Sequence, residues 1–213
     1  MSLSVSEIFY SIQGEGPNIG RPSVFLRLAG CNLKCNFCDT KYSWSNSEFE
    51  SISNKKIIQR IGKFGCKNLV ITGGEPLLQQ NEIKTLLDEL KEYKIEIETN
   101  GSIRLKIAKN IEQINCSPKL SNSGNLTYSL SILPNNKKVI YKFVVRKKSD
   151  ISEIQNFCKK YKIPKTKIWL MPEGTDRNTI IRRSVWLSEI CKKEGYNFSP
   201  RLHIMLWGNK RGK

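Results

Sequence analysis

The chain has 213 residues, a mass of 24.5 kDa, 38% hydrophobic and 26% charged residues, and a net charge of +17. This composition excludes a disordered or collagen-like protein, and the length is sufficient for a hydrophobic core without cross-links. No apolar run approaches the roughly 18 residues that a membrane span needs, and the N-terminus lacks the basic and apolar regions of a secretory signal. We therefore expect one domain over residues 1–213, located in the cytoplasm and without a membrane partner.

The excess positive charge is confined to the second half of the chain. Residues 1–100 contain 12 basic and 12 acidic residues, whereas residues 101–213 contain 24 basic and 7 acidic residues. Solvated lysines on exposed helix faces explain such an excess, and so does a docking surface for an anionic partner. A nucleic-acid partner is not expected, because the sequence contains no known RNA-binding motif.

Hydrophobic periodicity predicts alternating strands and helices along the chain. The expected strands cover 24–29, 67–72, 95–99, 111–116, 138–145 and 167–171, with a last one near 201–204, and the expected helices cover 53–64, 80–93, 150–162 and 177–194. Residues 119–137 form the longest irregular stretch and are predicted to be a loop. Strand–helix alternation favours an α/β fold with a mainly parallel sheet. With about six parallel strands, fewer than the eight of a closed barrel, we predict a partial, open TIM-like βα barrel.

Most residues with distinctive chemistry follow the ends of these predicted strands. They are the cysteines at 31, 35 and 38, the turn 73–76, the pair 99–100, the segment 117–119 and the pair 172–173. Ligands bind at the carboxyl ends of parallel strands in barrels and in open α/β sheets. The sequence therefore predicts one site at this edge of the sheet.

Seven cysteines in a chain without an export signal favour metal or catalytic roles over disulfides. Cys31, Cys35 and Cys38 lie within eight residues, so a loop can direct all three thiolates to one point. A structural zinc site normally has four protein ligands and would need a further ligand here; the sole histidine, His203, is distant in sequence. On a four-iron cluster, three thiolates leave one iron open for a non-protein ligand. We therefore favour a catalytic iron–sulfur cluster over zinc.

The spacing Cys31-x3-Cys35-x2-Cys38, followed by the turn Gly73-Gly74-Glu75-Pro76, resembles the radical S-adenosylmethionine (SAM) superfamily. The flanking segments resemble the 7-carboxy-7-deazaguanine synthase family over essentially the whole chain. These segments are 9–17, 27–33, 38–44, 98–101, 117–119 and 201–208. The resemblance thus implies one radical SAM domain with the barrel architecture expected above.

The resemblance also implies a reaction. Family members convert 6-carboxy-5,6,7,8-tetrahydropterin to 7-carboxy-7-deazaguanine in the biosynthesis of queuosine and other 7-deazapurines. A [4Fe-4S] cluster held by the three cysteines cleaves SAM, the resulting 5′-deoxyadenosyl radical abstracts hydrogen from the pterin, the ring contracts, and ammonia leaves. The family also uses Mg²⁺, and Thr40 matches its magnesium ligand.

Motif positions assign further roles under this resemblance. The residues expected to contact SAM are Phe37, Cys38, Asp39, Gly74, Glu75, Ser117, Pro118 and Lys119, with Gly74 and Glu75 receiving its amino group. The residues expected to contact the pterin are Ile12, Gln13, Gly14, Arg27 and Thr72, with Arg27 on its carboxylate. Arg27, Glu15 and His203 are the candidate catalytic residues. Glu75 as a helix cap and His203 as a core residue are the competing structural interpretations.

The resemblance further implies a homodimer and a flavodoxin or ferredoxin as electron donor. Such donors are typically acidic, so the basic half of the chain is a candidate docking surface. We expect this charge to lie on the surface and apart from the active site. A radical SAM activase that acts on a protein partner shares the cysteine spacing and remains the alternative function.

Overall fold

The computed structural model describes residues 1–44, 49–107, 110–125, 127–132, 134 and 136–213. Its strands are β1 (Ser2–Ile12), β2 (Pro22–Leu28), β3 (Glu50–Ser53), β4 (Asn68–Gly73), β5 (Lys94–Thr99), β6 (Ile111–Cys116), β7 (Val139–Val145), β8 (Ile168–Pro172) and β9 (Asn197–Phe198). Its α-helices are α1 (Asn54–Gly62), α2 (Gln80–Glu89), α3 (Asp150–Lys160), α4 (Arg177–Glu194) and α5 (Leu202–Trp207).

All of these strands belong to one sheet with the order β3-β1-β2-β4-β5-β6-β7-β8-β9. From β2 to β9 every neighbouring pair is parallel, whereas β1 pairs antiparallel with both β2 and β3. The sheet curves without closing, since no pairing between its end strands β3 and β9 is found among the described residues. The predicted open βα barrel is therefore confirmed, with the six expected parallel strands and a short seventh, β9.

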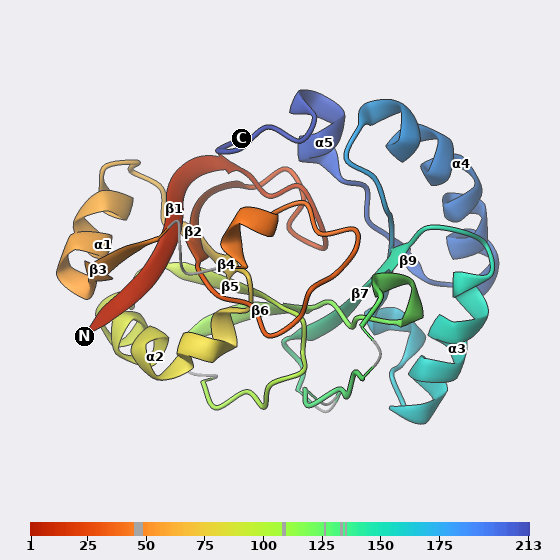
Figure 1. Ribbon diagram of the computed structural model, residues 1–213, viewed down its shortest axis with the longest axis horizontal. Coiled ribbons are helices and arrows are strands. Elements are labelled where there is room, and N and C mark those ends of the chain that lie inside the picture. The colour runs from red at the N-terminus through yellow and green to blue at the C-terminus, as the bar shows by residue number, and fades with distance from the viewer. Residues whose placement is uncertain (45–48, 108–109, 126, 133, 135) are drawn as a thin grey trace.

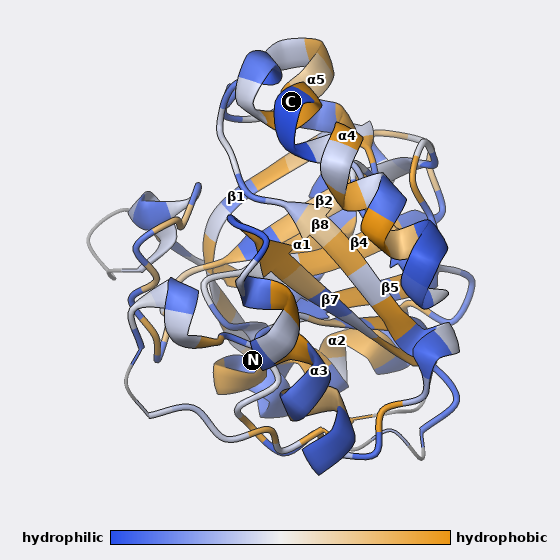
Figure 2. Cartoon of the chain, turned by 90° about the vertical axis from the view of Figure 1, so that its right-hand side faces the viewer, coloured by the Kyte–Doolittle hydropathy of each residue, from blue (hydrophilic) through white to orange (hydrophobic). Residues whose placement is uncertain are grey.

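The two faces of the sheet differ in chemistry because side chains alternate along each strand. Residues of one set are aliphatic or aromatic and are buried together with the helices, for example Leu26, Ile71, Ile97, Ile114 and Phe143. The residues between them include Arg27, Thr72, Glu98, Asn115 and Lys142. Figure 1 shows the helices outside the curve of the sheet and the loops after β1 and β2 inside it, and Figure 2 shows the mostly hydrophobic strands. The concave side is thus the polar side.

Two expectations about elements are wrong. Residues 201–204 were expected to be a strand, but Leu202–Trp207 form helix α5, in which the backbone N–H of Met205 donates to the carbonyl of Arg201 at 3.0 Å. A four-residue alternation is too short to separate a strand from a helix turn. The predicted elements also did not include β1 and β3, the two antiparallel strands at one edge of the sheet. None of the helices in the described ranges is long and apolar enough to cross a membrane.

Candidate active site

A single pocket lies at the carboxyl ends of the parallel strands. Its lining includes Cys31 after β2, Thr72 at the end of β4, Thr99 at the end of β5, Ser117 after β6 and Met171 near the end of β8. All of the predicted site residues except Glu75 and Pro118 line this pocket. The fold thus brings the segments that the strand-end argument singled out to one place.

The cysteine segment packs directly on the turn that follows β4. Leu28 at the end of β2 pairs with Gly73, and a Cβ on Gly73, whose φ is +151°, would overlap the Leu28 carbonyl. A Cβ on Gly74 would overlap the carbonyl of Gly30 and lie 2.8 Å from Cβ of Cys31. The two glycines are therefore required because any side chain would push the cysteine segment away from the sheet.

Each of the three clustered sulfur atoms has an N–H donor. Sγ of Cys31 accepts from the backbone N–H of Leu33 at 3.5 Å, and Sγ of Cys35 accepts from Asn125 Nδ2 at 3.3 Å. Sγ of Cys38 accepts from Trp44 Nε1 at 3.2 Å. Burial raises the pKa of Cys31 to about 11 and also raises the pKa of Cys35.

These sulfur environments fit an iron–sulfur cluster, because hydrogen bonds to sulfur and partial burial are the means by which proteins hold and tune such clusters. In the described parts of the chain, no three His, Cys, Asp or Glu side chains are arranged to hold a single metal ion.

Glu75 does not reach the pocket. Its side chain is fully buried, and it accepts hydrogen bonds from the N–H of Leu77 (2.9 Å), the hydroxyl of Thr99 (2.8 Å) and the N–H of Asn100 (2.7 Å). Burial raises the pKa of this carboxyl group. The carboxylate caps the 3-10 turn Pro76–Gln79 and ties it to the end of β5, as the competing structural interpretation stated.

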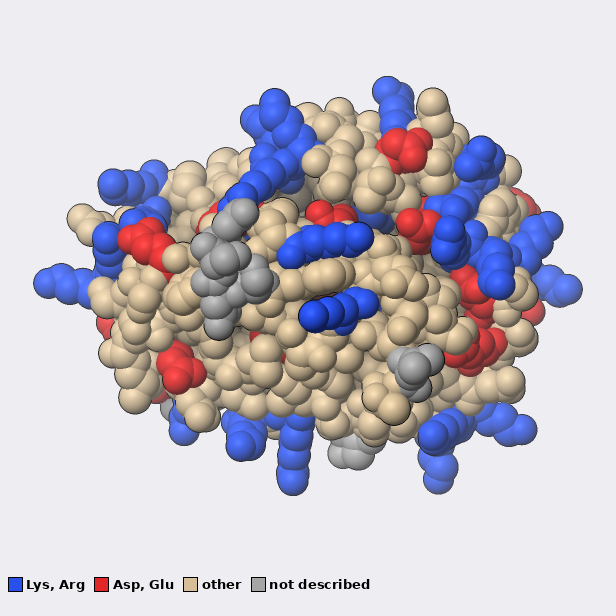
Figure 3. All heavy atoms as spheres, in the orientation of Figure 1, with Lys and Arg blue, Asp and Glu red and all other residues tan. Residues whose placement is uncertain are grey.

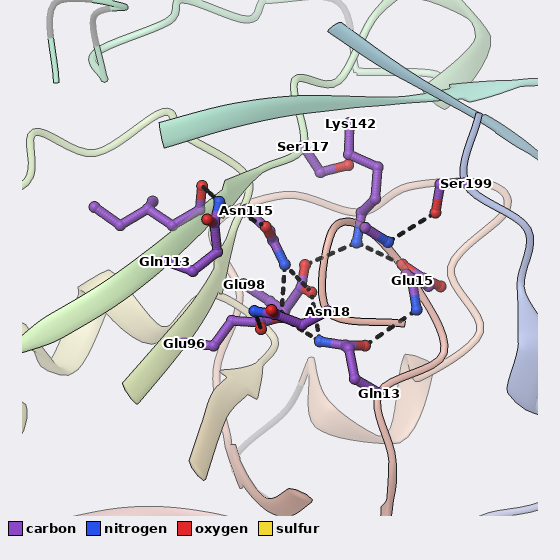
Figure 4. Close-up of polar contacts among 12 residues, drawn as sticks. Gln13, Glu15, Asn18, Glu96, Glu98, Gln113, Asn115, Ser117, Lys142 and Ser199 are labelled. Atoms are coloured by element: carbon purple, nitrogen blue, oxygen red, sulfur yellow. Dashed lines mark hydrogen bonds and ion pairs between the residues drawn. The ribbon is translucent and has the colours of Figure 1, made fainter. Parts of the chain in front are cut away.

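Charged side chains that line the pocket form a continuous, partly buried network, and Figure 4 shows its part around Lys142. Nζ of Lys142 lies 2.5 Å from Oε2 of Glu15 and 2.8 Å from Oε2 of Glu98. On the other side of Glu15, the Arg201 guanidinium contacts Oε1 of Glu15 at 3.2 Å and also pairs with Asp39. The network therefore alternates in charge from Glu98 to Asp39.

Burial would raise the pKa of Glu15, but the charges of Lys142 and Arg201 lower it well below its usual range. Glu15 is thus ionised in the folded protein.

Gln13 lines the pocket, yet its amide is already used within the protein. Nε2 of Gln13 donates to Glu96 and, at 3.3 Å, to Glu98, and its Oε1 accepts from the N–H of Glu15 at 3.2 Å. The side chain therefore fixes the segment after β1 against β5. This is a different use of Gln13 from the pterin contact expected from its motif position, which stays a prediction.

Arg27 is not isolated within its apolar strand. Its Nε donates to Oε1 of Glu7 at 2.7 Å, and Glu7 also accepts from the Tyr42 hydroxyl at 2.6 Å and from Nε of Arg211 at 3.3 Å. Within the described residues, the ion pair of Arg27 uses only Nε. The Glu7 carboxylate thus compensates part of the buried charge, while Arg27 still lines the pocket.

Comparison with known proteins gives the family. Residues 26–181 match the radical SAM superfamily. A protein of Pyrobaculum aerophilum named 7-carboxy-7-deazaguanine synthase is 38% identical, with 99% of this chain and 97% of that protein covered. The chain belongs to the 7-carboxy-7-deazaguanine synthase family of radical SAM enzymes. The superfamily implies a [4Fe-4S] cluster and SAM as the cofactors of this family member.

Further relatives agree with this assignment. A Clostridium acetobutylicum protein named 7-carboxy-7-deazaguanine synthase is also 38% identical, and the match covers 100% of both chains. The crystal structure of QueE from Escherichia coli has a TM-score of 0.76 at 25% identity and covers 95% of each chain. Streptococcus suis SuiB bound to its precursor peptide SuiA shares the fold alone, with a TM-score of 0.51 and 22% identity over 79% of this chain and 46% of that one.

The expectation that the basic half lies apart from the active site is wrong in part. Lys119, Lys142, Arg201 and Lys213 all belong to that half and line the pocket of this family member. Most of the other cations beyond residue 100 are exposed, and Figure 3 shows Lys and Arg side chains projecting around the whole outline of one face. Most of the excess positive charge therefore lies on solvated side chains, and a small part of it lies in the pocket.

Glu98 and Lys142 are among the pocket residues that the motif analysis did not assign to any role, although Glu98 lies in a segment that carries the family resemblance. Lys142 had one signal that could have identified it: it interrupts the apolar run of β7, where an unpaired lysine is costly. The same reasoning led to Arg27, whose strand is also apolar.

Proposed function

We propose that this chain converts 6-carboxy-5,6,7,8-tetrahydropterin to 7-carboxy-7-deazaguanine. The observation that carries the proposal is one pocket lined by the three clustered cysteines together with Glu15, Arg27 and other residues of the pterin-side motifs. The names of the relatives that match the whole chain support the same reaction. We also infer that residues 1–213 form one radical SAM domain, since one sheet includes strands from both ends of the chain.

The cofactor side of the pocket is assigned to the cysteine segment and the strand ends beside it. Cys31, Cys35 and Cys38 hold the cluster, which together with SAM supplies the radical that abstracts hydrogen from the substrate. Phe37 offers an apolar ring for the SAM adenine, and the backbone at Gly74 offers a carbonyl acceptor to its amino group. Cys38, Asp39, Ser117, Pro118 and Lys119 complete the assigned SAM contacts, and the buried Glu75 acts on them through Thr99 and Asn100.

Thr40 is the proposed Mg²⁺ ligand. Its side chain lines the pocket and makes no capping hydrogen bond to the short 3-10 turn Lys41–Ser43, which it precedes. The hydroxyl lies 3.7 Å from Sγ of Cys38. An oxygen ligand is therefore present beside the cluster segment, and oxygen is the donor that Mg²⁺ prefers.

The pterin side consists of Ile12, Gln13, Gly14, Arg27 and Thr72, with Glu15 and His203 as further catalytic candidates. The guanidinium of Arg27 is the proposed partner of the substrate carboxylate, because its Nη atoms extend beyond the Nε–Glu7 pair. An ionised Glu15 accepts hydrogen bonds from N–H groups of the substrate ring.

The proposal includes two macromolecular partners, a flavodoxin or ferredoxin and a second copy of the chain. The exposed cations of residues 101–213 support an acidic electron donor. Reduction rates that fall steeply with rising ionic strength would support this partner, and rates that do not respond would contradict it. Size-exclusion chromatography with light scattering tests the homodimer.

An anaerobic turnover assay tests the proposed reaction. The reconstituted protein should be brown and bind about four irons per chain. With the pterin, SAM and a reductant it should form 7-carboxy-7-deazaguanine, detected by mass spectrometry. SAM cleavage without this product would favour the activase alternative, which the synthase relatives do not favour. A colourless protein with stoichiometric zinc would contradict the whole proposal.

A further inference from the structure

Lys142 is a buried cation shared by two pocket carboxylates. Its side chain is 3% exposed and comes from β7, while Glu98 comes from β5 and Glu15 from the segment after β1. The ammonium lies 2.5 Å from Glu15 and 2.8 Å from Glu98, and all three residues line the pocket. One lysine therefore joins three separate parts of the chain at the site (Figure 4).

The charges that surround this lysine are unequal. Glu15 faces Lys142 on one side and Arg201 and His203 on another. Gln13 and Asn115 each donate hydrogen bonds to both Glu98 and a third carboxylate, Glu96. Burial and the nearby charge of Glu98 raise the pKa of Glu96. Asp39 lies beyond Arg201. Lys142 is thus the cation between the Glu96–Glu98 pair and Glu15, and it is the only ion-pair partner of Glu98 among the described residues.

Removal of the ammonium would leave two partly buried carboxylates without this compensation. Among the described residues, Glu98 would keep only the amide donors of Gln13 and Asn115, and Glu15 would keep the cation Arg201. A buried carboxylate that loses its cation takes up a proton more readily, and a protonated carboxyl group presents a donor where the ionised form presents only acceptors. The hydrogen-bonding character of this pocket wall therefore depends on Lys142.

We propose that Lys142 is a positioning residue that holds the carboxylates of Glu15 and Glu98 in place and directed at the substrate. Both carboxylates then accept hydrogen bonds from the N–H groups of the nitrogen heterocycle. This inference rests on the proposed function, because it takes a pterin as the occupant of the pocket. It goes beyond that function because it assigns Lys142 an indirect role in substrate binding. Lys142 acts through Glu15 and Glu98 and does not itself contact the reacting atoms.

Four variants test the inference in the cluster-loaded enzyme: K142M, K142R, the double variant K142M/E98Q, and K165M as a control. Lys165 is exposed and lies outside the pocket; its ammonium donates to the carbonyl of Glu194 and lies over the ring of Tyr196. The measurements are kcat and KM for the pterin between pH 5.5 and 8.5, binding of fluorescent 6-carboxypterin, and formation of 5′-deoxyadenosine from SAM without pterin.

We expect K142M to raise KM and the dissociation constant of 6-carboxypterin by at least about tenfold at pH 7, because one partner of a buried charge pair is lost. Its kcat/KM should gain an acid limb, since Glu15, which has lost the cation Lys142, takes up a proton more readily. K142R, which keeps the charge, should recover most of the loss without this limb. Pterin-independent SAM cleavage should persist in all variants. Equal KM values and pH profiles in K142M and wild type would overturn the inference.

Two further outcomes are separable. If K142M does not fold, the double variant K142M/E98Q replaces it, because E98Q removes one of the uncompensated carboxylates. The acid limb of kcat/KM should then come from Glu15 alone. The absence of this limb would overturn the inference. If wild type cleaves SAM but forms no deazaguanine, the proposed function fails. The thermal unfolding midpoints then decide about Lys142: K142M should gain stability relative to K142R as pH falls, and parallel curves overturn the inference.

Discussion

Gly14 lies directly against His203: a Cβ on Gly14 would overlap Nδ1 of the imidazole. The backbone carbonyl of Gly14 also accepts from the N–H of Leu202 at 2.9 Å, so the segment after β1 carries the start of α5. His203 lies 3.9 Å from Glu15, and burial lowers the pKa of its imidazole. The absence of a side chain at residue 14 therefore sets where the only histidine lies in the pocket.

We predict that Gly14→Ala displaces His203 and reduces kcat/KM for the pterin by at least about tenfold, an effect of roughly 1.4 kcal/mol. Cluster content and SAM cleavage without pterin should be retained, because the cysteine segment is separate from this contact. Steady-state kinetics and iron analysis measure both. Gly62→Ala is the matched control, since a Cβ on Gly62 meets no atom within 4 Å. Wild-type kinetics in the Gly14 variant would show that the histidine adjusts without loss.

The cysteine motif and the strand ends were predictable because both are local in sequence. The spacing of Cys31, Cys35 and Cys38 lies within eight residues, and the strand-end rule needs only strand order. The Lys142 network was not predictable in the same way. Lys142 lies 127 residues from Glu15 and 44 residues from Glu98. The pairing of β5, β6 and β7 brings Glu98 and Lys142 together, and Glu15 reaches them from the segment after β1.

The antiparallel edge of the sheet escaped prediction for a physical reason. Leu3 and Val5 are buried and alternate with more exposed residues, as expected of a strand. A register shift between Val5 and Glu7 then breaks this period, and Glu7 turns to the ion pair with Arg27. A bulge of this kind hides a strand from any pattern that requires strict alternation.

Cys35→Ala should abolish cluster binding and SAM cleavage together. Cys35 is buried at 7% exposure, and its sulfur accepts from Asn125 within the proposed cluster site. Three thiolates are the minimum that holds the cluster with one iron open, so the loss of one removes both properties. Iron content, visible absorbance and 5′-deoxyadenosine formation are the measurements. Cys66→Ala is the control, because the Cys66 thiol contacts the carbonyl of Pro22 at the start of β2, away from the pocket. Persistent SAM cleavage in the Cys35 variant would refute the ligand assignment.

Thr40→Ala should weaken the response of pterin turnover to Mg²⁺ while sparing the cluster. The variant removes the hydroxyl oxygen proposed as ligand and leaves Cys38 in place. We expect the Mg²⁺ concentration for half-maximal turnover to rise by about tenfold, the change expected for a loss of roughly 1.4 kcal/mol of binding energy. Thr175→Ala, at an exposed position outside the pocket, is the control. An unchanged Mg²⁺ titration would exclude Thr40 from the magnesium site.

Glu96 should make the fold more stable at mildly acidic pH than at alkaline pH. Burial and the charge of Glu98 raise the pKa of Glu96 to about 7, above the value of about 4.3 expected in the unfolded chain. The folded protein therefore binds a proton that the unfolded chain has already released. This contribution to the free energy of unfolding is complete below the unfolded pKa and is lost as pH rises through 7, by at most about 1.4 kcal/mol per pH unit. Chemical denaturation between pH 5 and 8.5 should show a smaller decline in Glu96→Gln than in wild type. The exposed Glu92→Gln should follow wild type, and coincident curves for all three proteins would mean that Glu96 is ionised throughout this range.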